Sequence, residues 1–309
     1  MSHRDDSPDL NNVSDTHGLA TADQSPTAGV SAPPSSRSWK AIPAIAWLCA
    51  AVLIAVAAVG GYVLGHQTAT PTTQELAARA HAGKITNVPR PQSDGSYDAT
   101  ISGPGREPED SSDVLSVHRR NSADPLSIGA LDAPVVISEY SDFYCPYCQH
   151  FNEETEPLII KDYVNKGLVR LEWNDVPAHG DNSIAAAKAA RAAAAQNKFF
   201  EYKNALFKKT SDEEGNQREL SIDDFVEIAK EVRVPNLEKF RADATSKEFD
   251  DVLANAQQQA ASIGVTGTPS FYVGTKFIGG AQPYEQFQAV ITQELAKVAS
   301  GEVKVPEVK

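Results

Sequence analysis

The sequence predicts an α/β domain with an inserted block of helices, preceded by a single membrane-spanning helix. Three observations lead to this fold class. An uncharged apolar stretch lies near the N-terminus, and a strand–helix–strand pattern begins at Val135. A helical block, two short strands and a final helix complete the chain. A Cys-Pro-Tyr-Cys turn at 145–148 joins the first strand to the first helix and marks the chemical centre.

Composition excludes several classes of protein. The chain has 309 residues and a formal net charge of −13. A nucleic-acid-binding protein needs a surplus of Lys and Arg to neutralise phosphates, so the acidic balance argues against that class. The three cysteines, Cys49, Cys145 and Cys148, are too few for a multi-bridge disulfide scaffold or a four-cysteine zinc site. We therefore expect no bound metal and no cofactor.

The N-terminal 64 residues predict a tail and an anchor. Residues 1–40 are rich in Ser, Pro and Asp and are expected to be disordered. Residues 41–64 contain no charge and are long enough for a transmembrane helix. The alternative is a secretory signal peptide, whose apolar region is normally about 7–15 residues long and does not follow so long a tail. Cys49, inside the apolar stretch, is expected to be inert.

The charges around the apolar stretch predict its orientation. Arg37 and Lys40 flank the N-terminal side, and the first positive charge on the other side is Arg79. By the positive-inside rule, the tail lies in the cytoplasm and everything after Leu64 lies outside it. The expected location is the cell membrane, with one pass and an extracytoplasmic domain.

Residues 65–123 are rich in Pro, Gly, Ser and acidic side chains and are interpreted as a stalk. A short helix is expected at Gln74–Ala82 and a short strand at Ser96–Ser102. The folded domain is expected to span residues 124–300, and residues 301–309 form a C-terminal tail.

The first half of the domain predicts a strand–helix–strand unit. Val135–Tyr140 is a buried strand by composition, and Leu168–Trp173 is a second one. Between them, a helical run extends from Pro146 to about Lys166. Pro157 should kink this run at Glu156, and Gly167 suits its end.

The second half predicts helices, a strand pair and a last helix. Ser221 with Asp224 resembles an N-terminal capping pattern, and Gly274–Thr275 suits a turn between two strands. The expected helices are Ser183–Lys209, Ser221–Glu231, Asn236–Ala244, Phe249–Ile263 and Tyr284 to about Ala299, and the expected strands are Ser270–Val273 and Lys276–Ile278.

Two cysteines three residues apart at a helix start suit thiol–disulfide exchange. Cys145 would sit at the helix N-terminus, where the helix dipole favours the thiolate, and Pro146 would take the first helical position. Cys148, one turn further, could resolve a mixed disulfide formed at Cys145. A half zinc site with His150 and His179, or an inert structural disulfide, are the alternatives. Closing so short a loop constrains the unfolded chain little, which makes a purely structural role a weak explanation.

Several stretches together resemble the DsbA-like family of disulfide oxidoreductases, which has a thioredoxin fold with a helical insertion. Residues 139–148 resemble the active-site strand and turn, and residues 264–271 resemble the cis-proline loop. The resemblance covers about Asp124 to Ala299, with the insertion at about 180–263. Residues 189–207 and 278–284 add to it.

The resemblance implies roles for further residues. Pro269 is expected to be cis and to pack against the dithiol, with the Thr268 backbone free to pair with an extended substrate. Without the family, this Thr-Pro step would be an ordinary turn into a strand. Glu139 is expected to be a buried acid that exchanges a proton with Cys148, the alternative being a solvent-facing strand residue.

Other polar residues near the dithiol are interpreted as structural. His150 and His179 are expected to be structural or surface residues. The cluster Glu153, Glu154 and Glu156 is expected to be a solvated helix face.

One residue departs from the family pattern. Many strong oxidases of the family carry His between the cysteines, whereas this chain has Tyr147, as glutaredoxins do. Tyr147 supplies no positive charge, which leaves the strength of oxidation open. A glutaredoxin itself would be small and cytosolic, and would lack the anchor and the insertion.

The expected function is that of an extracytoplasmic thiol:disulfide oxidoreductase that introduces disulfides through Cys145 and Cys148. Its expected partners are exported cysteine-containing proteins and a membrane quinone-linked protein that reoxidises the dithiol. A membrane-anchored reductase or isomerase is the first alternative. A non-catalytic module that binds extended peptides is the second.

Overall fold

The computed structural model describes residues 72–84, 89–106, 109, 113–212 and 214–305. The predicted tail, the predicted anchor at residues 41–64 and Cys49 lie outside these residues. Within the described ranges, no helix has both the length and the apolar character needed to cross a membrane.

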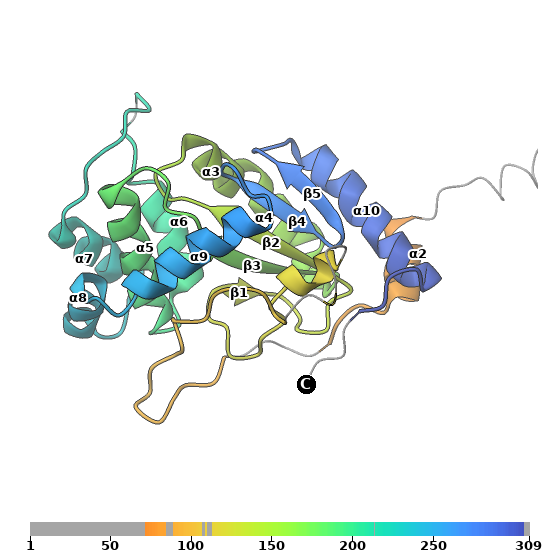
Figure 1. Ribbon diagram of the computed structural model, residues 1–309, viewed down its shortest axis with the longest axis horizontal. Coiled ribbons are helices and arrows are strands. Elements are labelled where there is room, and N and C mark those ends of the chain that lie inside the picture. Colours follow the sequence, from red (N-terminus) through yellow and green to blue (C-terminus); the bar gives the residue numbers. More distant parts are fainter. Residues whose placement is uncertain (1–71, 85–88, 107–108, 110–112, 213, 306–309) are drawn as a thin grey trace, which may run out of the picture. The chain divides into compact units, whose positions relative to one another are not determined.

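A five-stranded mixed sheet forms the centre of the domain (Figure 1). The strands are β1 (Ser127–Ile128), β2 (Val135–Ser141), β3 (Val169–Asp175), β4 (Ser270–Val273) and β5 (Lys276–Gly279). Their spatial order is β1-β3-β2-β4-β5, with β2 and β3 parallel and all other pairs antiparallel. The four strands predicted after residue 124 are confirmed. The two-residue β1 is too short to leave a pattern in the sequence.

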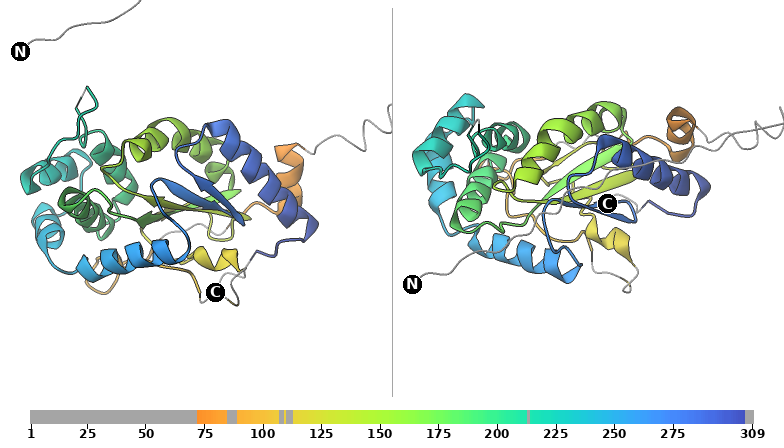
Figure 2. Two further views of the ribbon diagram at one scale, coloured as in Figure 1. Left: turned by 45° about the horizontal axis from the view of Figure 1, so that its top comes forward. Right: turned by 90° about the horizontal axis from the view of Figure 1, so that it is seen from above.

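Helices cover both faces of the sheet (Figure 2). On one face, apolar side chains of β2 to β5 pack with Ile159 of α4 (Glu156–Asp162) and with Phe287 and Ile291 of α10 (Tyr284–Ser300). On the other face, Tyr140 packs near α9 (Asp250–Ser262). β2 and β3 are buried along their whole lengths, as expected for strands covered on both sides.

The interpretation of residues 65–123 as a stalk is wrong for the part that the structure describes. Helix α2 (Thr73–Ala80) begins with a capping box and buries Leu76 against the α10 side of the core. The predicted strand at 96–102 is absent, and this segment instead docks through the Tyr97 amide, which donates to the Ala195 carbonyl at 2.9 Å. The compact unit therefore includes the described residues from Thr72 onward, whereas the sequence predicted a start at residue 124.

Buried charges attach the segment before β1 to the sheet. The Arg119 guanidinium pairs with Asp124 at 2.8 Å, and the Arg119 amide donates to Glu172 of β3 at 2.7 Å. Arg170, also on β3, pairs with Glu172 at 2.8 Å. His118 bridges Ser138 and the Gly274 carbonyl. Because each buried charge has a partner, this polar sheet face can be covered without solvent.

The helical run after the dithiol is divided rather than simply kinked. Helix α3 (Pro146–His150) passes into a π-helical turn at Phe151–Thr155, and α4 follows. Pro157 lies at the start of α4, where its missing N–H is tolerated. Gly167 ends the segment in the left-handed conformation (φ 71°), as predicted.

The insertion holds most of the remaining helices. The predicted single helix at 183–209 is wrong, because residues 195–198 interrupt it and Asn197 adopts a φ of 57°. Ser221 caps the next helix, as predicted, and Asn236 caps the one after it. The helices are α5 (Asp181–Ala194), α6 (Phe199–Phe207), α7 (Ile222–Glu231), α8 (Leu237–Thr245) and α9.

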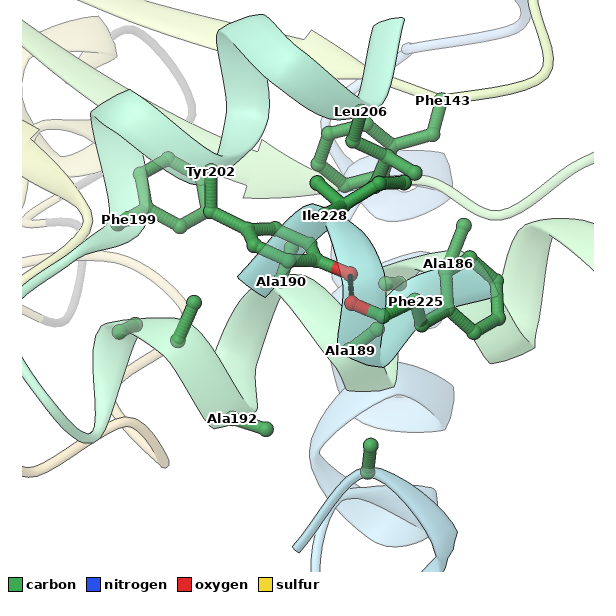
Figure 3. Packing of buried hydrophobic residues seen from close by; sticks show 14 of the residues in the cluster. Phe143, Ala186, Ala189, Ala190, Ala192, Phe199, Tyr202, Leu206, Phe225 and Ile228 are labelled. Atoms are coloured by element: carbon green, nitrogen blue, oxygen red, sulfur yellow. Dashed lines mark hydrogen bonds between the residues drawn. The ribbon is translucent and has the colours of Figure 1, made fainter. Parts of the chain in front are cut away.

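A second core lies inside this helical block (Figure 3). The alanines of α5 let α6 and α7 approach closely, and the Tyr202 hydroxyl donates to the Phe225 carbonyl at 3.2 Å. Phe143 joins this core from the turn before Cys145. The dithiol turn is thus anchored in the helical block on one side and in the sheet on the other.

Candidate active site

Strand β2 leads directly into the dithiol turn. Cys145 is the N-cap of α3, and Pro146 is its first residue, as the sequence predicted. The Cys145 carbonyl accepts hydrogen bonds from the amides of Cys148 and Gln149 at 3.0 and 3.1 Å. Both cysteines are free thiols, with Cys145 4% exposed and Cys148 fully buried. Tyr147, in contrast, is 69% exposed beside the turn.

The loop before β4 supplies the second side of the site. The Thr268–Pro269 peptide bond is cis. The Cys145 thiol donates to the Thr268 carbonyl at 3.3 Å. Antiparallel pairing of Tyr140 with Ser270 brings this loop to the dithiol, although the two cysteines precede it by more than 110 residues.

The pKa values of the two thiols are shifted in opposite directions. A hydrogen bond from Cys148 is the largest cause that lowers the pKa of Cys145 from 9.0 to about 6, against the effect of burial. The Thr268 side chain and the amides of Cys148 and Tyr147 lower it further. Burial, together with the neighbouring Cys145, raises the pKa of Cys148 well above 9.0. Near neutral pH, Cys145 is therefore mostly thiolate and Cys148 stays protonated.

Glu139 is buried, so the alternative of a solvent-facing residue is wrong. It is 3% exposed, and burial raises its pKa from 4.5 to about 7, against the opposing charge of Lys203. Ser141 lies two residues later on the same face of β2, and its hydroxyl lowers the pKa of both Glu139 and Cys148. Among the described residues, Glu139 Oε1 and Ser141 Oγ are buried without a hydrogen-bond partner.

Sequence reasoning missed a buried ion pair close to this acid. Glu156, expected in a solvated face, is buried and pairs with the buried Lys203 of α6, whereas Glu153 and Glu154 are exposed. The Lys203 ammonium also lies 5.6 Å from the centre of the Trp173 ring. A signal was present, since Lys203 occupies an apolar position in the helical spacing of Phe199, Tyr202, Leu206 and Phe207.

Asp142 fixes the dithiol turn by hydrogen bonds, a role that sequence reasoning also missed. Its carboxylate accepts from the Tyr144 amide at 2.8 Å, the Ala178 amide at 2.7 Å and His179 Nδ1 at 2.7 Å. Its carbonyl accepts from the Cys145 amide at 3.1 Å. His179 is therefore a structural residue of the site, as interpreted, and His150 is exposed.

The chain resembles known disulfide-forming proteins. A thioredoxin family profile matches residues 121–293, more than half of the chain, and a profile of the DsbA N-terminal domain matches residues 57–117. Disulfide bond formation protein D of Bacillus subtilis is 27% identical over 189 residues, covering 60% of this chain and 84% of that protein. The probable counterpart in Bacillus anthracis is 30% identical over 178 residues, covering 55% and 78%.

The fold agrees with these relatives. The crystal structure of oxidised BdbD from Bacillus subtilis superposes with a TM-score of 0.52 at 27% identity, covering 56% of this chain and 93% of that one. The dithiol turn, the buried acid and the loop before β4 lie within the segment that the thioredoxin profile matches. The chain belongs to the DsbA-like thioredoxin-fold family and is a thiol:disulfide oxidoreductase.

Proposed function

We propose that this oxidoreductase is a membrane-anchored disulfide donor that acts outside the cytoplasm on exported cysteine-containing proteins. The observation that favours disulfide donation over reduction is the low pKa of Cys145 beside the high pKa of Cys148. A stabilised thiolate stabilises the reduced enzyme, so the oxidised enzyme gives up its disulfide readily. The uncharged stretch at residues 41–64 is the proposed anchor. A membrane quinone-linked protein is the proposed reoxidant.

The steps follow from the positions of the groups. A substrate thiolate attacks Cys145 Sγ in the oxidised enzyme, so a substrate–Cys145 disulfide forms and the Cys145–Cys148 bond breaks. The released Cys148 thiolate takes a proton, and the proposed source is the buried acid Glu139, which shares the neighbour Ser141 with Cys148. A second substrate thiolate then attacks the substrate sulfur and releases Cys145 as a thiolate. The substrate loses two electrons, and the enzyme gains them as a dithiol.

The opposite direction is the second candidate, because Tyr147 adds no positive charge near Cys145. In a reductase, the Cys145 thiolate attacks a substrate disulfide. Cys148, deprotonated by Glu139, then resolves the mixed disulfide.

The reduction potential separates the two directions. The full-length protein in detergent is equilibrated with glutathione, and the reduced fraction is measured by thiol alkylation. We expect a value near about −120 mV, characteristic of DsbA, whereas a value near about −270 mV, characteristic of thioredoxin, would refute the donor. The Cys145→Ser variant, which cannot close the disulfide, is the control for background alkylation.

Location is tested separately. The full-length chain is expected in the membrane fraction, with its dithiol accessible to an impermeant thiol reagent in whole cells. A version without residues 1–64 is expected in the soluble fraction. A soluble full-length chain, or a dithiol labelled only after lysis, would contradict the proposed anchor and its orientation.

A further inference from the structure

A small pocket opens beside Cys145 on the side of the helical block. Cys145, Pro146 and Gln149 form its wall on the dithiol turn. Thr210, Ser211 and Gln217 line it from the loop that follows α6. Its volume is about 80 Å³. This loop belongs to the insertion, so the pocket joins the catalytic turn to a part of the chain that the reaction itself does not use.

Three of the polar side chains in the wall are already engaged. Ser211 Oγ donates to Gln149 Oε1 at 2.9 Å, and Thr210 Oγ1 donates to the Phe207 carbonyl at 3.1 Å. The Gln217 amide donates to the Tyr144 carbonyl. Tyr144 also lines the pocket, and its buried hydroxyl has no hydrogen-bond partner among the described residues. The exposed lining is nevertheless mostly carbon, which favours an apolar occupant.

We propose that this pocket binds a small aliphatic side chain next to the reacting cysteine of the substrate polypeptide. The inference rests on the proposed function. In the mixed disulfide, the substrate sulfur lies about 2 Å from Cys145 Sγ, and neighbouring Cα atoms are about 3.8 Å apart. A residue that flanks the substrate cysteine is therefore within reach of a pocket lined by Cys145 itself. The Thr268 carbonyl, on another side of the same sulfur, is left for the substrate backbone.

The pocket volume sets the size of the side chain. About 80 Å³ is the space of two to three water molecules at roughly 30 Å³ each. A valine side chain, with three carbon atoms, matches this space, whereas an indole exceeds it. We expect a valine-flanked substrate to react about tenfold faster than a glycine-flanked one, the equivalent of burying roughly two methylene groups. A tryptophan-flanked substrate should gain no such advantage.

The experiment compares peptide dithiols with the oxidised full-length protein in detergent. Each peptide carries two cysteines flanked on the same side by Gly, Ala, Val or Trp, and a second series places the varied residue on the other side. The rate at which the peptide disulfide appears is measured by mass spectrometry. The readout is the valine-to-glycine rate ratio, which is independent of the overall rate of each enzyme variant.

Two variants, Ser211→Tyr and Gln217→Trp, place a large ring in the pocket from the loop after α6. Two are used so that the comparison can still be made if one of them does not fold. Each is expected to reduce the valine-to-glycine ratio from about tenfold to less than about twofold. The matched control is Lys208→Tyr, which adds the same ring at an exposed position outside the pocket and should keep the ratio of the parent.

The outcomes separate the pocket from the function. A parent ratio below about twofold in both peptide series, or a ratio that persists in folded pocket-filled variants, would overturn the proposal. A failure of the proposed function shows itself differently, as a thioredoxin-like reduction potential with glutathione, in which no flanking residue takes part.

Discussion

The most direct test of the site's electrostatics is Cys148→Ala. The hydrogen bond from Cys148 is the largest influence on the Cys145 thiol and lowers its pKa from 9.0 to about 6. The substitution removes this donor and leaves Thr268 and the amides of the turn in place. We expect the ionisation midpoint of Cys145 to rise, because the thiolate loses its strongest stabilising contact.

The magnitude follows from the structure. A pKa of about 6 in place of 9.0 favours the thiolate about thousandfold, or roughly 4 kcal/mol at 1.36 kcal/mol per pH unit. A hydrogen bond to a charged group contributes about 1.5–3 kcal/mol, and a thiol is a weak donor, so the low end applies. Losing it should move the midpoint up by about one pH unit, and the remaining donors should keep it below that of an ordinary cysteine.

The assay is the rate of Cys145 alkylation between pH 4 and pH 10, since only the thiolate reacts. The parent protein is reduced before the measurement. Its buried Cys148 stays protonated over most of this pH range and therefore does not contribute to the alkylation rate. Tyr147→Phe is the matched control, because its ring is exposed and its backbone amide is retained. A parent midpoint between pH 8 and 9, or a Cys148→Ala midpoint unchanged from that of the parent, would refute the reasoning.

Three further predictions concern the buried polar groups. Because burial raises the pKa of Glu139 from 4.5 in the unfolded chain to about 7, the folded state binds more protons between these values and stability falls as the pH rises. Glu139→Gln should abolish this loss of unfolding free energy, which amounts to about 3 kcal/mol at pH 8. If the variant and the parent have the same urea midpoint at both pH 5 and pH 8, the prediction is wrong. Glu139→Gln and Ser141→Ala should each slow the step that releases or uses Cys148 at least about tenfold in stopped-flow measurements. The control is Ser138→Ala, which should leave this rate unchanged because Ser138 lies on the other face of β2 and bonds to His118. Lys203→Met leaves Glu156 buried without its cation and should cost about 3–5 kcal/mol in urea unfolding. Lys230→Met, from an exposed pair with Glu227, should cost less than about 1 kcal/mol, and equal losses in the two variants would show that the Lys203 pair is not buried as described.

The sequence predicted the elements that carry strong local signals. Strand β4 and the start of α7 match their predicted limits closely, because a β-rich run and a Ser221–Asp224 capping box define them locally. The two cysteines and Pro146 also occupy their predicted helix positions, since a proline after the N-cap fixes the start of α3.

The parts that failed depend on distant partners. The segment before β1 resembles a linker in composition, and its docking depends on Glu172 of β3, 53 residues after Arg119. The break between α5 and α6 lies in an alanine-rich run that has no local stop signal. There the Gln196 side chain exchanges two hydrogen bonds with the backbone of Asn236, the N-cap of α8. Glu156 looked solvated because its partner Lys203 lies 47 residues later, and the apolar helical position of Lys203 indicates burial without indicating which carboxylate it pairs with.

The Thr268 carbonyl lies 123 residues after the sulfur that it contacts, on the far side of the helical insertion. Pairing of so distant a strand with β2 is a slow, non-local event in folding. A nascent chain that has emerged only as far as α9 therefore carries the Cys-Pro-Tyr-Cys turn without this contact and without the β4 side of its burial. The hydrogen bond from Cys148 that most lowers the pKa of Cys145 lies within the turn itself and does not depend on β4. The side of the site that Thr268 and β4 form is thus completed only when the last strands close the sheet, after the dithiol turn has been synthesised.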